Sequence, residues 1–429
     1  MYPNRPPYPT HQGPPQGYHQ QSFHHPQQQY MQPQAPPNQG YPPYGQPPYP
    51  QGPPPPGQQN FYQGPPQGYH HAPPPPQAYQ QGPPPQGAPG HFRAASPYPP
   101  QPQFQGPIPS VPSPGYVPGQ QALGDFRAQA DQLRRAMKGF GTDEKALIQA
   151  LAKLDPLQMS AVRSTYAQHI RRDLYKDVKS ETSGYFRQGL LAIIDGPLTH
   201  DTTCARDAVQ GIGTKEWLLN DILLSRSNAD LNSIKSTYER TYKRPLQKDV
   251  EGDLSFKTLS LFSMVLRATR HEESAPLDPR IIEAEAQSLH AATAARMVNN
   301  AEEVCGIFSR SSDAELRAIN QAFSARYNIQ LDKHIDKEFS GHMKDALLHM
   351  LRTALDPAMY DAEQLEDCMK GMGTKDEKLV TRVVRLHWNP QHMDQVKRAY
   401  RVRYNRDLLD RVKGETSGDY QRLMLALLA

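Results

Sequence analysis

The 429-residue sequence predicts an all-α fold, in which four similar units of about five helices each follow a disordered amino-terminal tail. Three observations predict this organisation. The composition changes abruptly near residue 120, a short glycine motif recurs in the second part, and apolar residues there are spaced as on helix faces. Leu147, Ile148, Leu151 and Leu154 show that spacing, whereas the alternating pattern of half-buried strands is missing from the sequence.

Residues 1–120 are predicted to be a disordered tail rich in proline, glutamine, glycine and tyrosine. They contain 38 of the 45 prolines and 12 of the 22 tyrosines, whereas their only ionisable side chains besides seven histidines and the tyrosines are Arg5 and Arg93. Without aliphatic clusters, the tail cannot offset a backbone ordering cost of roughly 1–2 kcal/mol per residue. We therefore expect disorder with local polyproline II conformation.

The tail supports several functional hypotheses. The sequence QGPPQGYH occurs at residues 12–19 and again at 63–70, a repetition typical of segments that associate weakly. PxxP spacings offer recognition by proline-binding domains as an alternative, and a solubilising spacer is another. The tail is thus a candidate scaffold that recruits protein or RNA partners.

The remaining residues are nearly neutral. With Arg5 and Arg93 set aside, 45 Lys and Arg face 43 Asp and Glu, a net charge of +2. Nucleic acid is not an expected partner of this core, because proteins that bind it normally carry a larger, clustered positive excess. Cys204, Cys305 and Cys368 form no CxxC pair, which indicates neither a disulfide framework nor a zinc site.

The sequence carries no signal for secretion, membrane insertion or catalysis. No secretory leader and no apolar run near the ~18 residues that span a bilayer occurs, so we expect a cytoplasmic protein. A P-loop, a dinucleotide fingerprint and a GxSxG motif are all missing, and the histidines lack metal-ligand spacing. We predict a protein that is not an enzyme.

Two motifs define the repeated units. The string MKGFGT at Met137–Thr142 returns as VQGIGT at Val209–Thr214 and as MKGMGT at Met369–Thr374. Leu174, Leu246, Leu331 and Leu408 are each followed seven residues later by an acid, and these acids are Glu181, Asp253, Glu338 and Glu415. Together the motifs predict units at residues 121–195, 196–272, 273–355 and 356–429.

Helix boundaries follow from capping and proline signals. Thr142 is predicted to cap a helix whose first turn carries Asp143 and Glu144. Five prolines are expected at unit boundaries or between helices: Pro156, Pro197, Pro279, Pro357 and Pro390.

The glycine loop has the chemistry of a calcium site. Its glycines permit backbone conformations that turn carbonyl oxygens toward one point, and calcium accepts about 6–8 oxygen ligands, carbonyls and bidentate carboxylates included. In the first unit Met137, Gly139 and Gly141 would supply three carbonyls and Glu181 two more oxygens. Such a site binds calcium weakly alone, so a lipid phosphate that completes the shell would make calcium and anionic lipid bind cooperatively.

The GxGT loop, paired with an acid 42 residues after its first glycine in the first unit, resembles the annexin family from about residue 123 to 429. The resemblance implies a curved disc of four five-helix repeats, with calcium loops on the convex face against phosphatidylserine-type membranes. It implies calcium-dependent binding to anionic phospholipids, with roles in membrane organisation or vesicle trafficking. The protein would associate with membranes peripherally when calcium rises.

The ligands of the family carry over differently in each unit. The fourth unit retains Met369, Gly371, Gly373 and Glu415, and its two extra residues are expected in a connection between helices, near Trp388–His392. The second unit retains Val209, Gly211, Gly213 and Asp253. A weaker site is expected there, because Gln210 replaces the lysine and Phe256 replaces the glycine that follows Ser255.

The third unit is expected to bind no calcium through its loop. The stretch 294–300 (AARMVNN) has no glycine, although Glu338 remains. For the other three units, the alternative to calcium binding is that the loop glycines merely end or join helices. Thr142 with Glu144 offers an accessory calcium site, and Lys138 and Lys370 either touch lipid phosphates or are simply solvated.

Overall fold

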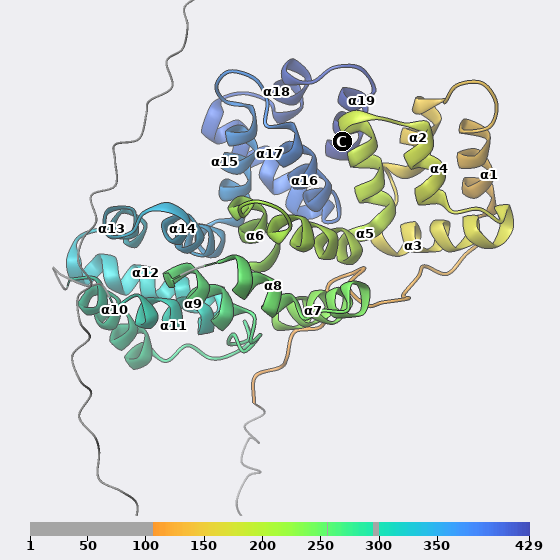
Figure 1. Cartoon of the computed structure of the whole chain (residues 1–429). Helices are drawn as coiled ribbons and strands as arrows, with labels where there is room; N and C mark the ends of the chain where they lie inside the picture. Colours follow the sequence, from red (N-terminus) through yellow and green to blue (C-terminus); the bar gives the residue numbers. More distant parts are fainter. Residues whose placement is uncertain (1–105, 255, 295–299) are drawn as a thin grey trace, which may run out of the picture. The chain divides into compact units, whose positions relative to one another are not determined.

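The computed structural model describes residues 106–254, 256–294 and 300–429 and confirms the all-α prediction. Within these ranges every regular element is a helix, and no strand occurs (Figure 1). All the described helices belong to one compact unit of the chain, within Ala95–Ala429. Among these described helices, none combines the length and the apolarity needed to cross a bilayer.

The helices fall into four groups in chain order. The first group comprises α1 (Arg127–Ala136), α2 (Glu144–Leu151), α3 (Pro156–Thr165) with its π-helical continuation η1 (Tyr166–Ile170), α4 (Leu174–Glu181) and the first half of α5 (Gly184–Val209). α5 breaks at Gly196, whose φ of 70° and ψ of 171° are not helical, and Pro197 follows. The second group comprises the rest of α5, α6 (Glu216–Leu223), α7 (Asn228–Tyr242), α8 (Leu246–Asp253) and α9 (Phe256–Val265).

The third and fourth groups repeat this arrangement. The third comprises α10 (Pro279–Ala294), α11 (Ala301–Arg310), α12 (Asp313–Tyr327), α13 (Leu331–Glu338) and α14 (Gly341–Leu355). The fourth comprises α15 (Pro357–Met369), α16 (Asp376–His387), α17 (Pro390–Tyr404), α18 (Leu408–Glu415) and α19 (Gly418–Leu428). When the halves of α5 are counted separately, each group has five helices within the described residues, as predicted.

Four of the five prolines expected at unit boundaries or between helices begin a helix, and the fifth, Pro197, follows the break in α5. Pro156, Pro279, Pro357 and Pro390 are each the first residue of a helix, where the missing N–H would have no partner inside the helix. The connection between α16 and α17 is only Trp388 and Asn389. α16 is 12 residues long where α2 has 8, and α2 is joined to α3 by residues 152–155. The expectation that the extra residues of the fourth unit lie in the connection is therefore wrong, because the helix is longer there and the connection is shorter.

The predicted cap at Thr142 is wrong by one residue. The cap of α2 is Asp143, whose carboxylate accepts a hydrogen bond from the N–H of Ala146 at 2.9 Å. Sequence alone could not separate the two candidates, because both side chains can cap. The hydroxyl of Thr142 is instead used across the loop, toward Glu181.

Two hydrophobic clusters hold the groups together in pairs. One cluster joins the first and fourth groups, and its buried residues include Leu133, Tyr166, Leu190, Val380 and Tyr400. The last helix, α19, packs on α2, α5 and α16 (Figure 1). Because fully burying one leucine contributes about 1.5–3 kcal/mol, the two ends of the helical core stabilise each other.

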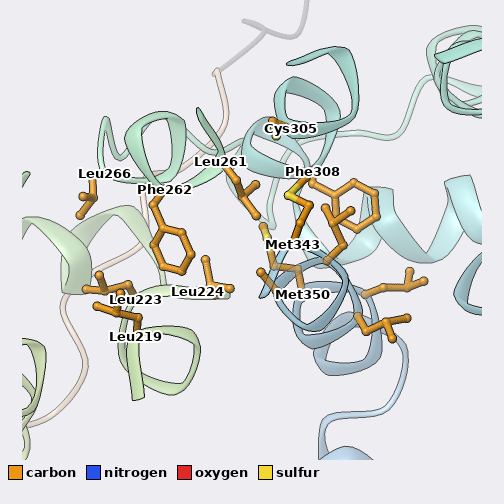
Figure 2. Packing of buried hydrophobic residues seen from close by; sticks show 14 of the residues in the cluster. Leu219, Leu223, Leu224, Leu261, Phe262, Leu266, Cys305, Phe308, Met343 and Met350 are labelled. Carbon is orange, nitrogen blue, oxygen red and sulfur yellow. The ribbon is translucent and has the colours of Figure 1, made fainter. Parts of the chain in front are cut away.

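The other cluster joins the second and third groups. Figure 2 shows Phe262 of α9 facing Leu219 and Leu223 of α6, whereas its neighbour Leu261 points toward Phe308 of α11. Consecutive residues of α9 therefore point toward different helices. This position between α6 and α11 lets one short helix connect two repeats.

A buried ion pair connects the second group of helices to the fourth. Arg382 of α16 donates from Nε to the carboxylate of Asp221 of α6 at 2.8 Å, and both side chains are buried. Asp201 of α5 accepts hydrogen bonds from Arg226 and from the hydroxyl of Tyr116. These charged groups line a cavity of about 720 Å³.

Residues 106–120 differ from the expectation of disorder for residues 1–120. The N–H of Ser110 donates to Glu272 at 2.9 Å, the N–H of Ser113 donates to Asp230 at 2.7 Å, and Tyr116 is buried. The composition of this segment matches the tail, so only its partners on the folded core distinguish it. The predicted disorder of residues 1–105 lies outside the described residues.

Candidate calcium-binding loops

Three glycine loops share one backbone geometry. Loop 1 (residues 137–142) joins α1 to α2, loop 2 (209–214) joins α5 to α6, and loop 4 (369–374) joins α15 to α16. Each loop is closed by a hydrogen bond from the N–H of the next residue to a carbonyl of the preceding helix. These bonds run from Asp143 to Ala136 at 2.9 Å, from Lys215 to Ala208 at 2.9 Å and from Lys375 to Cys368 at 2.8 Å.

The two glycines of each loop are required by their backbone conformation and not by a lack of room for a side chain. The first glycine of each loop has φ between +97° and +120°, and the second has φ between +79° and +85°. A Cβ at any of these positions would meet no atom within 4 Å. Residues with side chains rarely adopt such φ values, so a substitution would redirect the loop carbonyls without any clash. The alternative that these glycines merely end helices leaves the second glycine unexplained.

The loop threonine brings each predicted acid to its loop. The hydroxyl of Thr142 donates to the backbone carbonyl of Glu181 at 3.2 Å and contacts its carboxylate at 3.3 Å, across 39 residues of chain. Thr374 contacts the carbonyl of Glu415 at 3.3 Å and its carboxylate at 3.0 Å. Thr214 donates to the carboxylate of Asp253. The predicted loop–acid pairs are therefore neighbours, although the sequence argument gave no role to the threonine in joining them.

The middle residue of each loop is apolar and fully exposed. Phe140, Ile212 and Met372 have relative exposures of 111%, 108% and 105%. Sequence reasoning missed these residues, although the signal was present: the variable position of every GxGT string holds a large apolar side chain. An apolar tip beside a candidate calcium site suits contact with a lipid surface better than contact with water.

The third loop is only partly described. The N–H of Asn300 donates to the carbonyl of Ala292 at 2.8 Å, which closes a connection one residue longer than in the other units. The predicted lack of calcium binding rests on residues 294–300, and 295–299 lie outside the described residues. Glu338, the acid of this unit, lies 3.6 Å from Lys337.

Phe256 occupies a backbone position that glycine holds in the other units. Its φ is +49°, close to the +57° to +62° of Gly184, Gly341 and Gly418. A bulky residue in this left-handed region is strained, and the ring is 88% exposed, so no burial offsets the strain. Phe256 follows Asp253 by three residues and therefore lies at the loop 2 end of α8.

A cation from α18 contacts loop 4 and its acid. The guanidinium of Arg411 donates from Nη2 to the carbonyl of Met369 and from Nη1 to the carboxylate of Glu415. Burial alone would raise the pKa of Glu415, but hydrogen bonds from Arg411 and Thr374 hold that pKa below its usual value. Two predicted calcium ligands, one from the loop and one from α18, thus converge on a single positive group.

The donor set suits a hard cation. Loops 1 and 2 combine backbone carbonyls with one carboxylate each, which are ligands that calcium prefers. No cluster of three or more His, Cys, Asp or Glu side chains that could hold a metal occurs among the residues that the structure describes. A site that depends largely on carbonyls is consistent with that finding. Lys370, a candidate contact for lipid phosphate, forms an ion pair with Asp367 at 2.9 Å.

Comparison with known proteins gives consistent matches. The annexin family profile matches residues 128–193, 201–258, 284–350 and 360–427. Annexin C1 of Cryptococcus neoformans var. grubii is 37% identical over 364 residues, which are 79% of this chain and 77% of that protein. Human annexin A7 is 33% identical over 304 residues, 71% of this chain and 62% of that protein.

Solved structures agree with the sequence matches. A structure of an annexin A8 mutant has a TM-score of 0.69 at 27% identity, covering 74% of this chain and 99% of that chain. Chicken annexin V has a TM-score of 0.65 at 28% identity, covering 72% and 97%. The calcium-bound structure of annexin (Sm)1 has a TM-score of 0.64 at 25% identity, covering 75% and 93%.

Proposed function

This chain belongs to the annexin family, and we propose that loops 1, 2 and 4 bind calcium and thereby attach it to anionic, phosphatidylserine-type membranes. Calcium-dependent phospholipid binding is the general property of this family, whose members are generally non-enzymatic. The proposed ligands are the carbonyls of Met137, Gly139, Gly141, Val209, Gly211, Gly213, Met369, Gly371 and Gly373 with the carboxylates of Glu181, Asp253 and Glu415. We place the protein in the cytoplasm, with a role in membrane organisation or vesicle trafficking.

The observation that carries this proposal is the threonine contact between each loop and its acid. The hydroxyl of Thr142 lies within 3.3 Å of the Glu181 carboxylate, so loop and acid already lie together. Calcium can then bind without a large ordering cost. A shell with open positions is completed by lipid phosphate, and several weak sites on one protein add avidity.

The apolar loop tips support a lipid surface as the partner. Phe140, Ile212 and Met372 are exposed on the loops that carry the proposed ligands. Calcium would neutralise the headgroups while these side chains leave water. A soluble anionic ligand would use the calcium alone and leave the tips exposed.

Cosedimentation with vesicles tests the proposal. With phosphatidylserine-containing vesicles, we expect pelleting that rises with calcium and reverses on chelation, and with zwitterionic vesicles we expect none. Calcium is varied up to about 1 mM, a range suited to sites with few charged ligands. Failure to pellet with anionic vesicles at the highest calcium concentration would overturn the proposal.

The tail offers a second candidate function, a scaffold that gathers protein or RNA partners. The repeated QGPPQGYH sequence motivates it, and a chain lacking residues 1–105 tests it. That deletion retains Ser110, Ser113 and Tyr116, which contact the core. We expect vesicle binding to survive the deletion. If the protein is mainly a scaffold, the deletion should instead abolish its main activity, the recruitment of protein or RNA partners.

Replacing Phe256 by glycine is expected to change stability and membrane binding in opposite directions. Removing a side chain from the left-handed conformation should stabilise the fold by about 1 kcal/mol. Because Phe256 already adopts the φ that glycine has in the other units, the substitution should leave the proposed ligands of loop 2 in place. Losing an exposed ring beside loop 2 should then raise the calcium concentration needed for vesicle binding. Urea unfolding measures the first effect, and calcium-titrated cosedimentation measures the second.

Phe256→Asn serves as the matched control for this experiment. Asparagine tolerates the left-handed region better than phenylalanine but carries no ring. Both variants should bind vesicles more weakly if the ring contacts lipid. Unchanged binding by both variants would show that Phe256 has no part in the membrane contact.

A further inference from the structure

The charge pattern beneath loop 4 is the reverse of that beneath loops 1 and 2. Three residues before each loop stand Arg134, Arg206 and Glu366, and three residues after the first leucine of α4, α8 and α18 stand Asp177, Asp249 and Arg411. Each such pair forms an ion pair: Arg134 with Asp177 at 3.8 Å, Arg206 with Asp249 at 2.7 Å, and Arg411 with Glu366 at 3.2 Å. The acid and the base have exchanged helices in the fourth unit.

Each of the three ion pairs also has a tyrosine hydroxyl on its carboxylate, which confirms that the three sets of residues are equivalent. Tyr166 donates to Asp177 at 2.8 Å and Tyr238 donates to Asp249 at 2.7 Å. In the fourth unit Tyr400 donates instead to Glu366. In all three units the tyrosine hydroxyl bonds to the acid of the pair. Each unit therefore keeps an acid, a base and a tyrosine, but in the fourth unit the acid and the base have exchanged helices.

The exchange places a guanidinium at the proposed calcium position. Arg411 precedes Glu415 by four residues on α18, so both side chains lie on one face of the helix. Arg411 also reaches the carbonyl of Met369, and it is only 13% exposed. At the equivalent positions of units 1 and 2, Asp177 and Asp249 cannot donate to a loop carbonyl.

Calcium and this guanidinium cannot share the same oxygens. The two hydrogen bonds to Met369 and Glu415 must break before calcium can contact either group, and a nearby positive charge repels the ion. Glu366 provides an alternative position for the displaced side chain, since it already contacts Nε of Arg411 at 3.2 Å and Nη2 at 3.4 Å. The arrangement therefore has two positions for one cation.

We propose that Arg411 is an internal competitor of calcium in loop 4, so that this loop takes calcium only at concentrations above those that fill loop 1. The inference rests on the proposed function, because it assumes that both loops can bind calcium. Loop 4 would therefore fill with calcium after loop 1. Membrane attachment through loop 1 would precede attachment through loop 4 as calcium rises.

Methionine methyl NMR on the full chain provides a separate readout for each loop without lipid. Met137 reports loop 1, and Met369 and Met372 report loop 4. In a titration with calcium chloride, Met137 should respond at a lower concentration than Met372. The variant Glu366→Arg/Arg411→Asp recreates the polarity of units 1 and 2 and should lower the loop 4 midpoint by about tenfold or more.

A second double variant, Glu366→Gln/Arg411→Met, removes both charges and covers the case in which the first does not fold. It should also lower the loop 4 midpoint, while the Met137 midpoint stays unchanged in both variants. Equal loop 4 midpoints in the wild type and the folded variants would overturn the inference, as would a loop 4 that stays silent in them. A silent Met137 would instead count against the proposed function of loop 1.

Discussion

Glu181→Gln should raise the calcium concentration for half-maximal vesicle binding by about tenfold or more, because loop 1 loses its only proposed charged ligand. The fold should persist, since glutamine has the same shape and its amide oxygen can still accept the hydrogen bond from Thr142. Cosedimentation across a calcium titration measures the shift. Adding Glu415→Gln should raise the midpoint further by a smaller factor, because Arg411 already holds Glu415.

Glu338→Gln is the matched control for this experiment. It removes the same charge from the equivalent helix of the third unit, whose loop has no glycine and is proposed to bind no calcium. Its vesicle binding should match the wild type. If Glu181→Gln with Glu415→Gln leaves the calcium requirement untouched, the ligand assignment is wrong even though the family is established.

Arg382→Met should destabilise the protein by about 3–5 kcal/mol, because it leaves the carboxylate of Asp221 buried without its cation. Arg382 also donates to the carbonyl of Gln364 at 2.8 Å, so α6, α15 and α16 all lose a contact. Urea unfolding at neutral pH measures the loss. Because the pair connects the second and fourth groups of helices, unfolding should also become less cooperative.

The pH dependence of this variant tests the electrostatic cause. Burial alone would raise the pKa of Asp221, but the ion pair with Arg382 holds that pKa below its usual value. The pair therefore stabilises the wild type above the unfolded pKa of about 3.9, and this contribution is lost as the pH falls through the lower folded pKa. In Arg382→Met the carboxylate should protonate at higher pH, so the stability gap should narrow as the medium is acidified.

Arg385→Met provides the comparison for Arg382. Arg385 lies 3.8 Å from Asp201, which keeps Arg226 and the hydroxyl of Tyr116 as partners in the variant. Its loss should cost about 1 kcal/mol or less, as for weakly coupled pairs. Equal destabilisation by the two variants would mean that lost packing, rather than an unpaired buried charge, accounts for the effect of Arg382.

The helical class, the repeats and the loop–acid pairs were all predictable from the residues. Gly139 and Gly141 indicate a loop because residues with side chains rarely adopt their positive φ values. This is a local property, so the short sequence motif alone predicts it. The recurrence of that string at Gly211 and Gly371 then predicts the same loop again. Helical periodicity and the prolines that begin helices are local signals of the same kind.

Contacts between distant residues required the folded structure. The GxGT motif does not indicate that Thr142 will bond to Glu181 rather than cap its helix. Nor does the tail-like composition around Ser110 and Tyr116 indicate that these residues contact the folded core. The pairing of the first group with the fourth also depends on which apolar faces meet. Arg411 reads in the sequence as one more surface charge, and it becomes the cation of loop 4 only because α18 lies beside Met369. Local conformational preference is carried by neighbouring residues, whereas the charge at a site is the sum of groups that only tertiary packing brings together.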